Sequence, residues 1–76
     1  MPPLPVVSAR TAVRVFGEFG WSVARRESSH IVLRQEGHWA RLSVPEHGKA
    51  ARGALRTLIR TAGLTVTEFV EALEQL

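Results

Sequence analysis

The 76-residue chain contains no cysteine and no aspartate, and no apolar run approaches the ~20 residues needed to span a membrane. Without cysteine, a disulfide network, a thiolate metal site and a thiol nucleophile are all excluded. This composition fits a reducing cytoplasm. The first residues, "MPPLPVV", carry no basic residue and no long apolar core, so they lack the pattern of a signal peptide. We therefore expect a small cytoplasmic protein without a membrane anchor.

Positive charge is unevenly distributed along the chain. Residues 1–64 contain all ten basic side chains and four glutamates, a net charge of +6, whereas residues 65–76 contain three glutamates and no base, a net charge of −3. A basic body indicates a polyanionic partner such as nucleic acid. Nine of the ten bases are arginine, which a GC-rich genome also favours, so the positions of the charges carry more information than their number.

The hydrophobic pattern predicts one small α+β domain. Ser8 is placed to cap a helix over residues 9–20, whose expected core face is Ala9, Ala12, Val13, Phe16 and Phe19. Strands are expected over residues 21–27, 30–35 and 38–44, followed by a helix over 50–62 that buries Leu55, Leu58, Ile59 and Ala62. Thr65 and Glu68 form a capping-box pattern that begins a last helix through Leu76. Residues 1–7 are expected to form a loose arm, and residues 8–76 a single domain with helices on one face of a three-stranded antiparallel sheet.

A two-residue connection through Glu36-Gly37 predicts the pairing of the last two strands. Leu33 would oppose Ala40 and Ile31 would oppose Leu42, which places four apolar residues on one buried face. The open face would then hold three pairs: His30 with Ser43, Val32 with Arg41, and Arg34 with Trp39. We expect Ser22, Ala24 and Arg26 on this same open face.

Two groups of residues suit a nucleic-acid surface, and each has an ordinary structural interpretation. Arg52, Arg56 and Arg60 recur every four residues after Lys49, which would let them follow a phosphate backbone or simply form a solvated helix face. The predicted Arg34–Trp39 pair could stack a base or merely cover the indole. Trp21, directly after Gly20, is interpreted as a core anchor.

The three histidines do not form a metal-binding pattern. His30, His38 and His47 have no helical-turn spacing and no aspartate or cysteine beside them. A lone histidine nevertheless suits RNA cleavage without a metal, because an imidazole can remove the proton from a 2′-hydroxyl that then attacks the adjacent phosphate. From the residues alone, however, the ordinary interpretation of His30 as a partly exposed strand residue is favoured.

The segment from Gly20 to Leu73 resembles the HicA toxin family of prokaryotic toxin–antitoxin systems. The matching elements are Gly20-Trp21, Ser28-Ser29-His30, Val44-Pro45-Glu46-His47, the helix residues 53–59 ("GALRTLI") and Ala62-Gly63-Leu64. Two positions depart from the family pattern. Ser28 stands where a glycine is usual, which should stiffen the turn before His30, and Ile31 stands where many members have a second histidine.

The resemblance implies a double-stranded-RNA-binding-like fold and a metal-independent mRNA interferase that needs no cofactor. Its active histidine corresponds to His30, while no role is assigned to His47. With that resemblance, the residues expected to hold phosphate and RNA are Ser29, Arg26, Arg34, Arg41, Lys49, Arg52 and Arg56. The implied partner is a HicB-type antitoxin that neutralises the toxin, and operator DNA would be reached only through that antitoxin.

Two other functions remain open from the sequence. A non-catalytic RNA-binding module would use the same basic surface. A protein-interaction domain would use the acidic last helix and Trp39 for docking, and its RNA affinity would be negligible and insensitive to salt.

Overall fold

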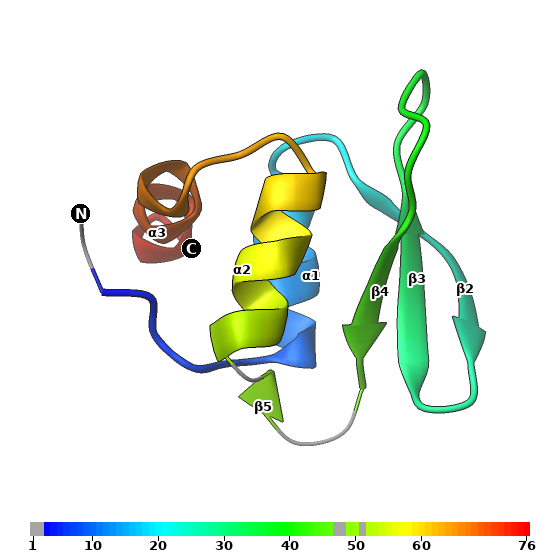
Figure 1. The fold of residues 1–76 in the computed structure, drawn as a ribbon, viewed down its shortest axis with the longest axis horizontal. Coiled ribbons are helices and arrows are strands. Elements are labelled where there is room, and N and C mark those ends of the chain that lie inside the picture. The colour runs from blue at the N-terminus through cyan, green and yellow to red at the C-terminus, as the bar shows by residue number, and fades with distance from the viewer. Residues whose placement is uncertain (1–2, 47–48, 51) are drawn as a thin grey trace.

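A computed structural model of the chain describes residues 3–46, 49–50 and 52–76. The element order is β1 (Val7–Ser8), α1 (Ala9–Gly17), β2 (Ser22–Glu27), β3 (His30–Arg34), β4 (Leu42–Pro45), β5 (Lys49–Ala50), α2 (Arg52–Thr61) and α3 (Val66–Glu74). The strands β2, β3 and β4 form an antiparallel sheet in that order, and Figure 1 shows the helices to one side of it. This arrangement confirms the predicted α+β fold of the double-stranded-RNA-binding type.

The predicted helix starts are confirmed at their capping residues. The Ser8 hydroxyl accepts a hydrogen bond from the Thr11 amide at 3.2 Å, and Thr65 and Glu68 exchange both bonds of a capping box at 2.9 and 3.1 Å. The first helix ends three residues earlier than predicted, at Gly17. The chain then turns through Gly20, whose φ is +94° and where an added Cβ would lie 2.7 Å from the side-chain nitrogen of Gln35.

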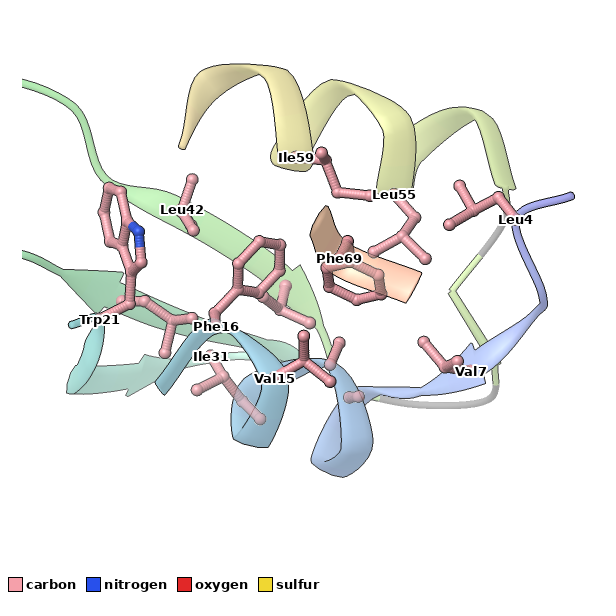
Figure 2. Packing of buried hydrophobic residues seen from close by; sticks show 14 of the residues in the cluster. Leu4, Val7, Val15, Phe16, Trp21, Ile31, Leu42, Leu55, Ile59 and Phe69 are labelled. Atoms are coloured by element: carbon pink, nitrogen blue, oxygen red, sulfur yellow. The ribbon is translucent and has the colours of Figure 1, made fainter. Parts of the chain in front are cut away.

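The core lies between the helices and the sheet (Figure 2). Trp21 is 4% exposed, which confirms its interpretation as an anchor, and Phe16 packs against Phe69 with ring centroids 5.3 Å apart. The core face of α1 was predicted only in part, because Val15 is fully buried whereas Val13 and Phe19 lie at its margin. On α2 the fully buried residues are Leu55 and Ile59, with Leu58 and Ala62 packed beside them.

The first residues pack more closely than a loose arm would. Leu4 is 2% exposed and Val7 is 7% exposed, and both belong to the core. Val7 and Ser8 form β1, which pairs antiparallel with β5. Two apolar side chains and a short ladder therefore hold this segment against the domain, and the sequence predicted neither.

The predicted register of the last two strands is wrong by two residues. Ile31 opposes Val44 and Leu33 opposes Leu42, and the Gln35–His38 turn is present with a 3.1 Å hydrogen bond from the His38 amide to the Gln35 carbonyl. Regular pairing resumes only at Leu42, so the connection is longer than two residues. Because the shift is an even number, every side chain of β3 keeps its predicted face. His30 therefore still lies on the open face, but opposite Pro45 rather than Ser43.

The predicted grouping on β2 is wrong for a different reason. The β2–β3 register shifts between Val23 and Arg25, which marks a β-bulge at Ala24. Beyond the bulge each side chain changes face, so Arg26 opposes the buried Ile31 and points to the helix side. Arg25 takes its place on the open face, opposite Val32.

Candidate active site around His30

His30 begins β3 directly after the turn that joins it to β2. The turn consists of Ser28 and Ser29, so that Glu27 and His30 form the last cross-strand pair before it. Ser28 has a φ of +52°, a positive value of the kind that hairpin turns of types I′ and II′ require at their first central position. The His30 side chain is exposed on the face of the sheet that no helix covers.

The neighbours of His30 are defined by the two ladders. Glu27 lies opposite it on β2 and Pro45 opposite it on β4. Side chains in directly opposed positions have Cβ atoms about 4.5–5.5 Å apart, so the Glu27 carboxylate lies within reach of the imidazole. The Arg25 guanidinium donates a hydrogen bond to this carboxylate. An imidazole, a carboxylate and a guanidinium thus share one exposed surface.

Glu27 was absent from the residues predicted from the sequence. The signal that could have found it was the serine pair, because a two-residue hairpin connection pairs the residues on either side of it.

Ser29 lies at the turn and is half-buried. Its carbonyl accepts a 2.6 Å hydrogen bond from the Glu46 amide, which extends the β3–β4 ladder past Pro45. This bond ties the turn before His30 to the end of β4. The position of Ser29 therefore depends on both neighbouring strands.

Arg26 lies in a groove on the helix side of the sheet. The groove has a volume of about 370 Å³ and runs between α1 and the β2 edge, where Arg10 and Arg14 also line it. Arg26 donates to the Glu46 carboxylate, so part of its charge is neutralised. The predicted place of Arg26 beside His30 on the open face is therefore wrong.

The remaining predicted arginines fall into two groups. Arg34 ends β3 and Arg41 precedes β4, and both are exposed at the end of the hairpin remote from His30. Arg52 and Arg56 are exposed on α2 and line a hollow of about 520 Å³ with Pro3, Leu4 and Pro5. The structure thus brings the N-terminal segment, and not the sheet, against these two side chains.

Two residues singled out in the sequence, Lys49 and His47, lie partly or wholly outside the described part of the chain. The backbone of Lys49 lies in β5 opposite Ser8, while its side chain is outside the described part of the chain. His47 is also outside the described residues.

Within residues 3–46, 49–50 and 52–76, no three histidine, aspartate or glutamate side chains gather as metal ligands would. No helix in that part of the chain has the length and apolar character needed to cross a membrane.

One family model, described as the HicA toxin of bacterial toxin–antitoxin systems, matches residues 9–64, a range that includes the turn before His30 and all three strands of the sheet. The chain belongs to the HicA toxin family. It is therefore the toxin component of a toxin–antitoxin system, and a cognate antitoxin is its partner. No curated protein matches the sequence.

In this HicA toxin, replacement of Ser28 by glycine is expected to stabilise the fold. The left-handed conformation costs a non-glycine residue about 1–2 kcal/mol, and the greater freedom of glycine in the unfolded chain offsets about 0.4–1 kcal/mol of that gain. We expect Ser28→Gly to add about 0.5 kcal/mol, or roughly 2–4 °C in the melting temperature.

Thermal unfolding followed by circular dichroism measures the effect of Ser28→Gly. Gly37→Ala is the matched control, because Gly37 has a φ of +80° in the other hairpin connection and the substitution should lower the melting temperature. A lower melting temperature for Ser28→Gly would mean that the serine side chain stabilises the turn by more than its backbone strain.

Proposed function

We propose that this HicA toxin is a metal-independent mRNA endoribonuclease of the cytoplasm, with His30 as its acid–base group. Cutting mRNA would inhibit translation. The observation that supports the proposal most directly is the position of His30, because its imidazole is exposed at the end of a strand and flanked by a carboxylate and a guanidinium.

The reaction that suits this site is an internal attack within the RNA strand. The His30 imidazole takes the proton from a 2′-hydroxyl, and the 2′-oxygen forms a bond to the neighbouring phosphorus. The bond from phosphorus to the 5′-oxygen breaks, and the leaving oxygen takes a proton from water. The products are a 2′,3′-cyclic phosphate and a 5′-hydroxyl.

The charged neighbours have separate tasks in this reaction. The Arg25 guanidinium faces the same surface and would stabilise the negative charge that develops on the phosphate oxygens. The Glu27 carboxylate would orient the imidazole from the opposite strand. Ser29 would donate its hydroxyl to a phosphate oxygen, while Arg34 and Arg41 would hold the strand farther along the hairpin.

The basic residues outside the open face are proposed to contact RNA away from the reacting phosphate. The RNA would contact Lys49, Arg52 and Arg56 only where it passes around the end of the sheet toward α2 and β5, which follow β4 in the chain (Figure 1). Arg26 would contact RNA that lies along the groove at the β2 edge. We assign these four residues to flanking-strand contacts and not to the reacting phosphate.

We expect the purified protein to cut a long mRNA in the presence of EDTA. Because the mechanism needs no Lewis acid, the chelator should leave the rate unchanged, and the fragments should end in cyclic phosphate and 5′-hydroxyl groups. Gel separation of the fragments, followed by end-group labelling, measures both. Fragments with 3′-hydroxyl and 5′-phosphate ends, or loss of cutting in EDTA, would contradict the mechanism.

The antitoxin provides the natural control for that experiment. We propose a HicB-type partner that covers the open face, so that addition of the partner stops the cleavage. Contact of this complex with operator DNA would occur through the antitoxin.

A non-catalytic RNA-binding module is the second candidate. It is favoured by the position of His38, the other histidine in the described part of the chain, which lies at the opposite end of the hairpin. Only one described imidazole therefore serves a reaction with two proton transfers. This module would bind RNA with the same basic surface and leave it intact.

A further inference from the structure

The β3–β4 connection carries a side chain that the reaction at His30 does not use. Trp39 is 88% exposed, compared with 48% or less for the other exposed large hydrophobic residues that the structure describes. Figure 1 shows this connection projecting beyond the rest of the molecule. The protein therefore presents an indole ring to solvent at the tip of its longest hairpin.

The indole is supported from behind by two other rings. The His38 imidazole is stacked on Trp39, with ring centroids 6.1 Å apart and planes inclined by 20°. His38 in turn contacts the buried Trp21, with centroids 4.9 Å apart. The rings of Trp21, His38 and Trp39 thus follow one another from the core to the exposed tip, where the indole of Trp39 is open to a ligand.

Backbone hydrogen bonds hold these rings in place. The His38 amide donates to the Gln35 carbonyl at 3.1 Å, and the Ala40 amide donates to the Nδ1 atom of His38 at 3.1 Å. Ala40 is buried, with an exposed fraction of 6%. The His38 imidazole beside Trp39 is therefore held both by the Ala40 amide and by its contact with the buried Trp21.

The surroundings of Trp39 favour a nucleobase over a protein surface. The exposed charged residues in or next to the connection are Arg34, Glu36 and Arg41, with a net charge of +1. The other exposed large hydrophobic side chains of the described residues, Val6, Val23 and Leu76, lie on other segments. A protein-docking patch needs several hundred Å² of contiguous apolar surface, whereas a base needs one flat ring and a cation for its phosphate.

The tip is well separated from His30 along the hairpin. His30 and Arg34 are the first and last residues of β3, about 13 Å apart at 3.3 Å per residue, and Trp39 lies farther along the connection. This separation exceeds the spacing of about 3.4 Å between successive nucleotides along one strand of a duplex, so the two places would contact different nucleotides. One RNA strand on the open face could therefore reach both places.

We propose that Trp39, supported by His38 and Trp21, is a stacking site for one unpaired base of single-stranded RNA, away from the bond that is cut. This site rests on the proposed function in that its ligand is RNA. It makes the toxin selective for single strands, because a paired base cannot turn its ring face toward the indole. It contributes binding and leaves the chemical step to His30.

The test measures affinity in a protein that cannot cut its ligand. With His30→Ala as the common background, the dissociation constant for a labelled single-stranded RNA of roughly ten nucleotides is measured with and without Trp39→Ala. We expect Trp39→Ala to weaken binding by roughly 5- to 150-fold, the range for loss of one base–aromatic stack. Trp39→Phe should retain most of the affinity, and Leu76→Ala, at another exposed apolar side chain, should retain all of it.

Two further measurements separate stacking from other causes. The affinity should fall with salt at the same slope in both proteins, because no phosphate contact is lost. In the cleaving protein, Trp39→Ala should raise KM and leave kcat nearly unchanged. The melting temperature should not move, since the indole is exposed.

Several results would overturn the inference. If single-stranded RNA binds equally with and without Trp39, or if the loss is the same for an abasic strand, no base stacks there. Weaker binding of the antitoxin with unchanged RNA affinity would make Trp39 a protein contact. Failure of the wild-type protein to bind RNA at all would remove the proposed function together with the stacking site, which distinguishes the two failures.

Discussion

Replacement of His30 by alanine is expected to lower the rate of mRNA cleavage by about 10²- to 10⁴-fold, the contribution that a positioned acid–base group makes. RNA affinity should stay close to that of the wild type, because the arginines of the open face are untouched. The melting temperature should also stay close, since the His30 side chain is exposed and belongs to no buried cluster. The change therefore isolates chemistry from binding and folding.

His30→Asn sharpens this experiment. Asparagine keeps a polar side chain at the same position but cannot carry a proton between the 2′-hydroxyl and solvent, so it should be as inactive as alanine. Single-turnover cleavage of a long mRNA in EDTA measures the rate, and fluorescence anisotropy measures the affinity. Undiminished cleavage by both variants would place the active group elsewhere. Binding without cleavage by the wild type would establish the RNA-binding module instead.

The sequence predicts the face of the sheet on which His30 lies, but it does not predict the residues that oppose it. Alternation along β3 places Ile31 and Leu33 on the buried face, and it therefore places His30 on the open face whichever even register the sheet adopts. The longer β3–β4 connection changed the residue opposite His30 but not the face. The face is thus a local property of the strand, whereas the register depends on how the connection packs.

The bulge in β2 could not be predicted in the same way. One unpaired residue at Ala24 moves Arg26 to the helix side and Arg25 to the open face. The sequence "VARRE" is compatible both with a regular strand and with a bulged one, because either arginine can be exposed. Which arginine stands near His30 therefore depends on the bulge, which leaves Arg26 in the groove between α1 and the β2 edge, where it meets Glu46.

The short β1–β5 ladder escaped prediction because two residues in each strand carry no periodic signal. The burial of Leu4 likewise depends on packing with residues far along the chain, and the preceding prolines in "MPPLP" are typical of an extended segment. The capping residues Ser8 and Thr65, by contrast, act on amides only three residues away. Their roles are therefore present in the local sequence.

Replacement of Phe69 by alanine is expected to destabilise the protein by about 3–5 kcal/mol. Phe69 is fully buried, and its ring lies 5.3 Å from that of Phe16 in the centre of the core (Figure 2). A chain of 76 residues has a total stability of roughly 4–11 kcal/mol, so this single loss approaches the whole. The expected result is a protein that is largely unfolded, or that melts tens of degrees lower.

Denaturant unfolding followed by circular dichroism measures this loss, and Phe69→Leu, which leaves a smaller cavity, keeps it measurable if the alanine variant does not fold. Glu71→Ala is the matched control on the same helix, where an exposed side chain should change stability by no more than about 0.5 kcal/mol. An unchanged melting temperature for Phe69→Ala would mean that α3 is dispensable.

The prediction for Phe69 also defines the extent of the domain. The family match ends at residue 64, yet α3 begins at Val66 and supplies Phe69 and Val70 to the buried core. A chain that stopped at the end of the match would expose Phe16 to water and lose more apolar contact than any single substitution removes. The acidic helix is therefore expected to be part of the folding unit, with Phe69 and Val70 turned inward and Glu68, Glu71 and Glu74 exposed.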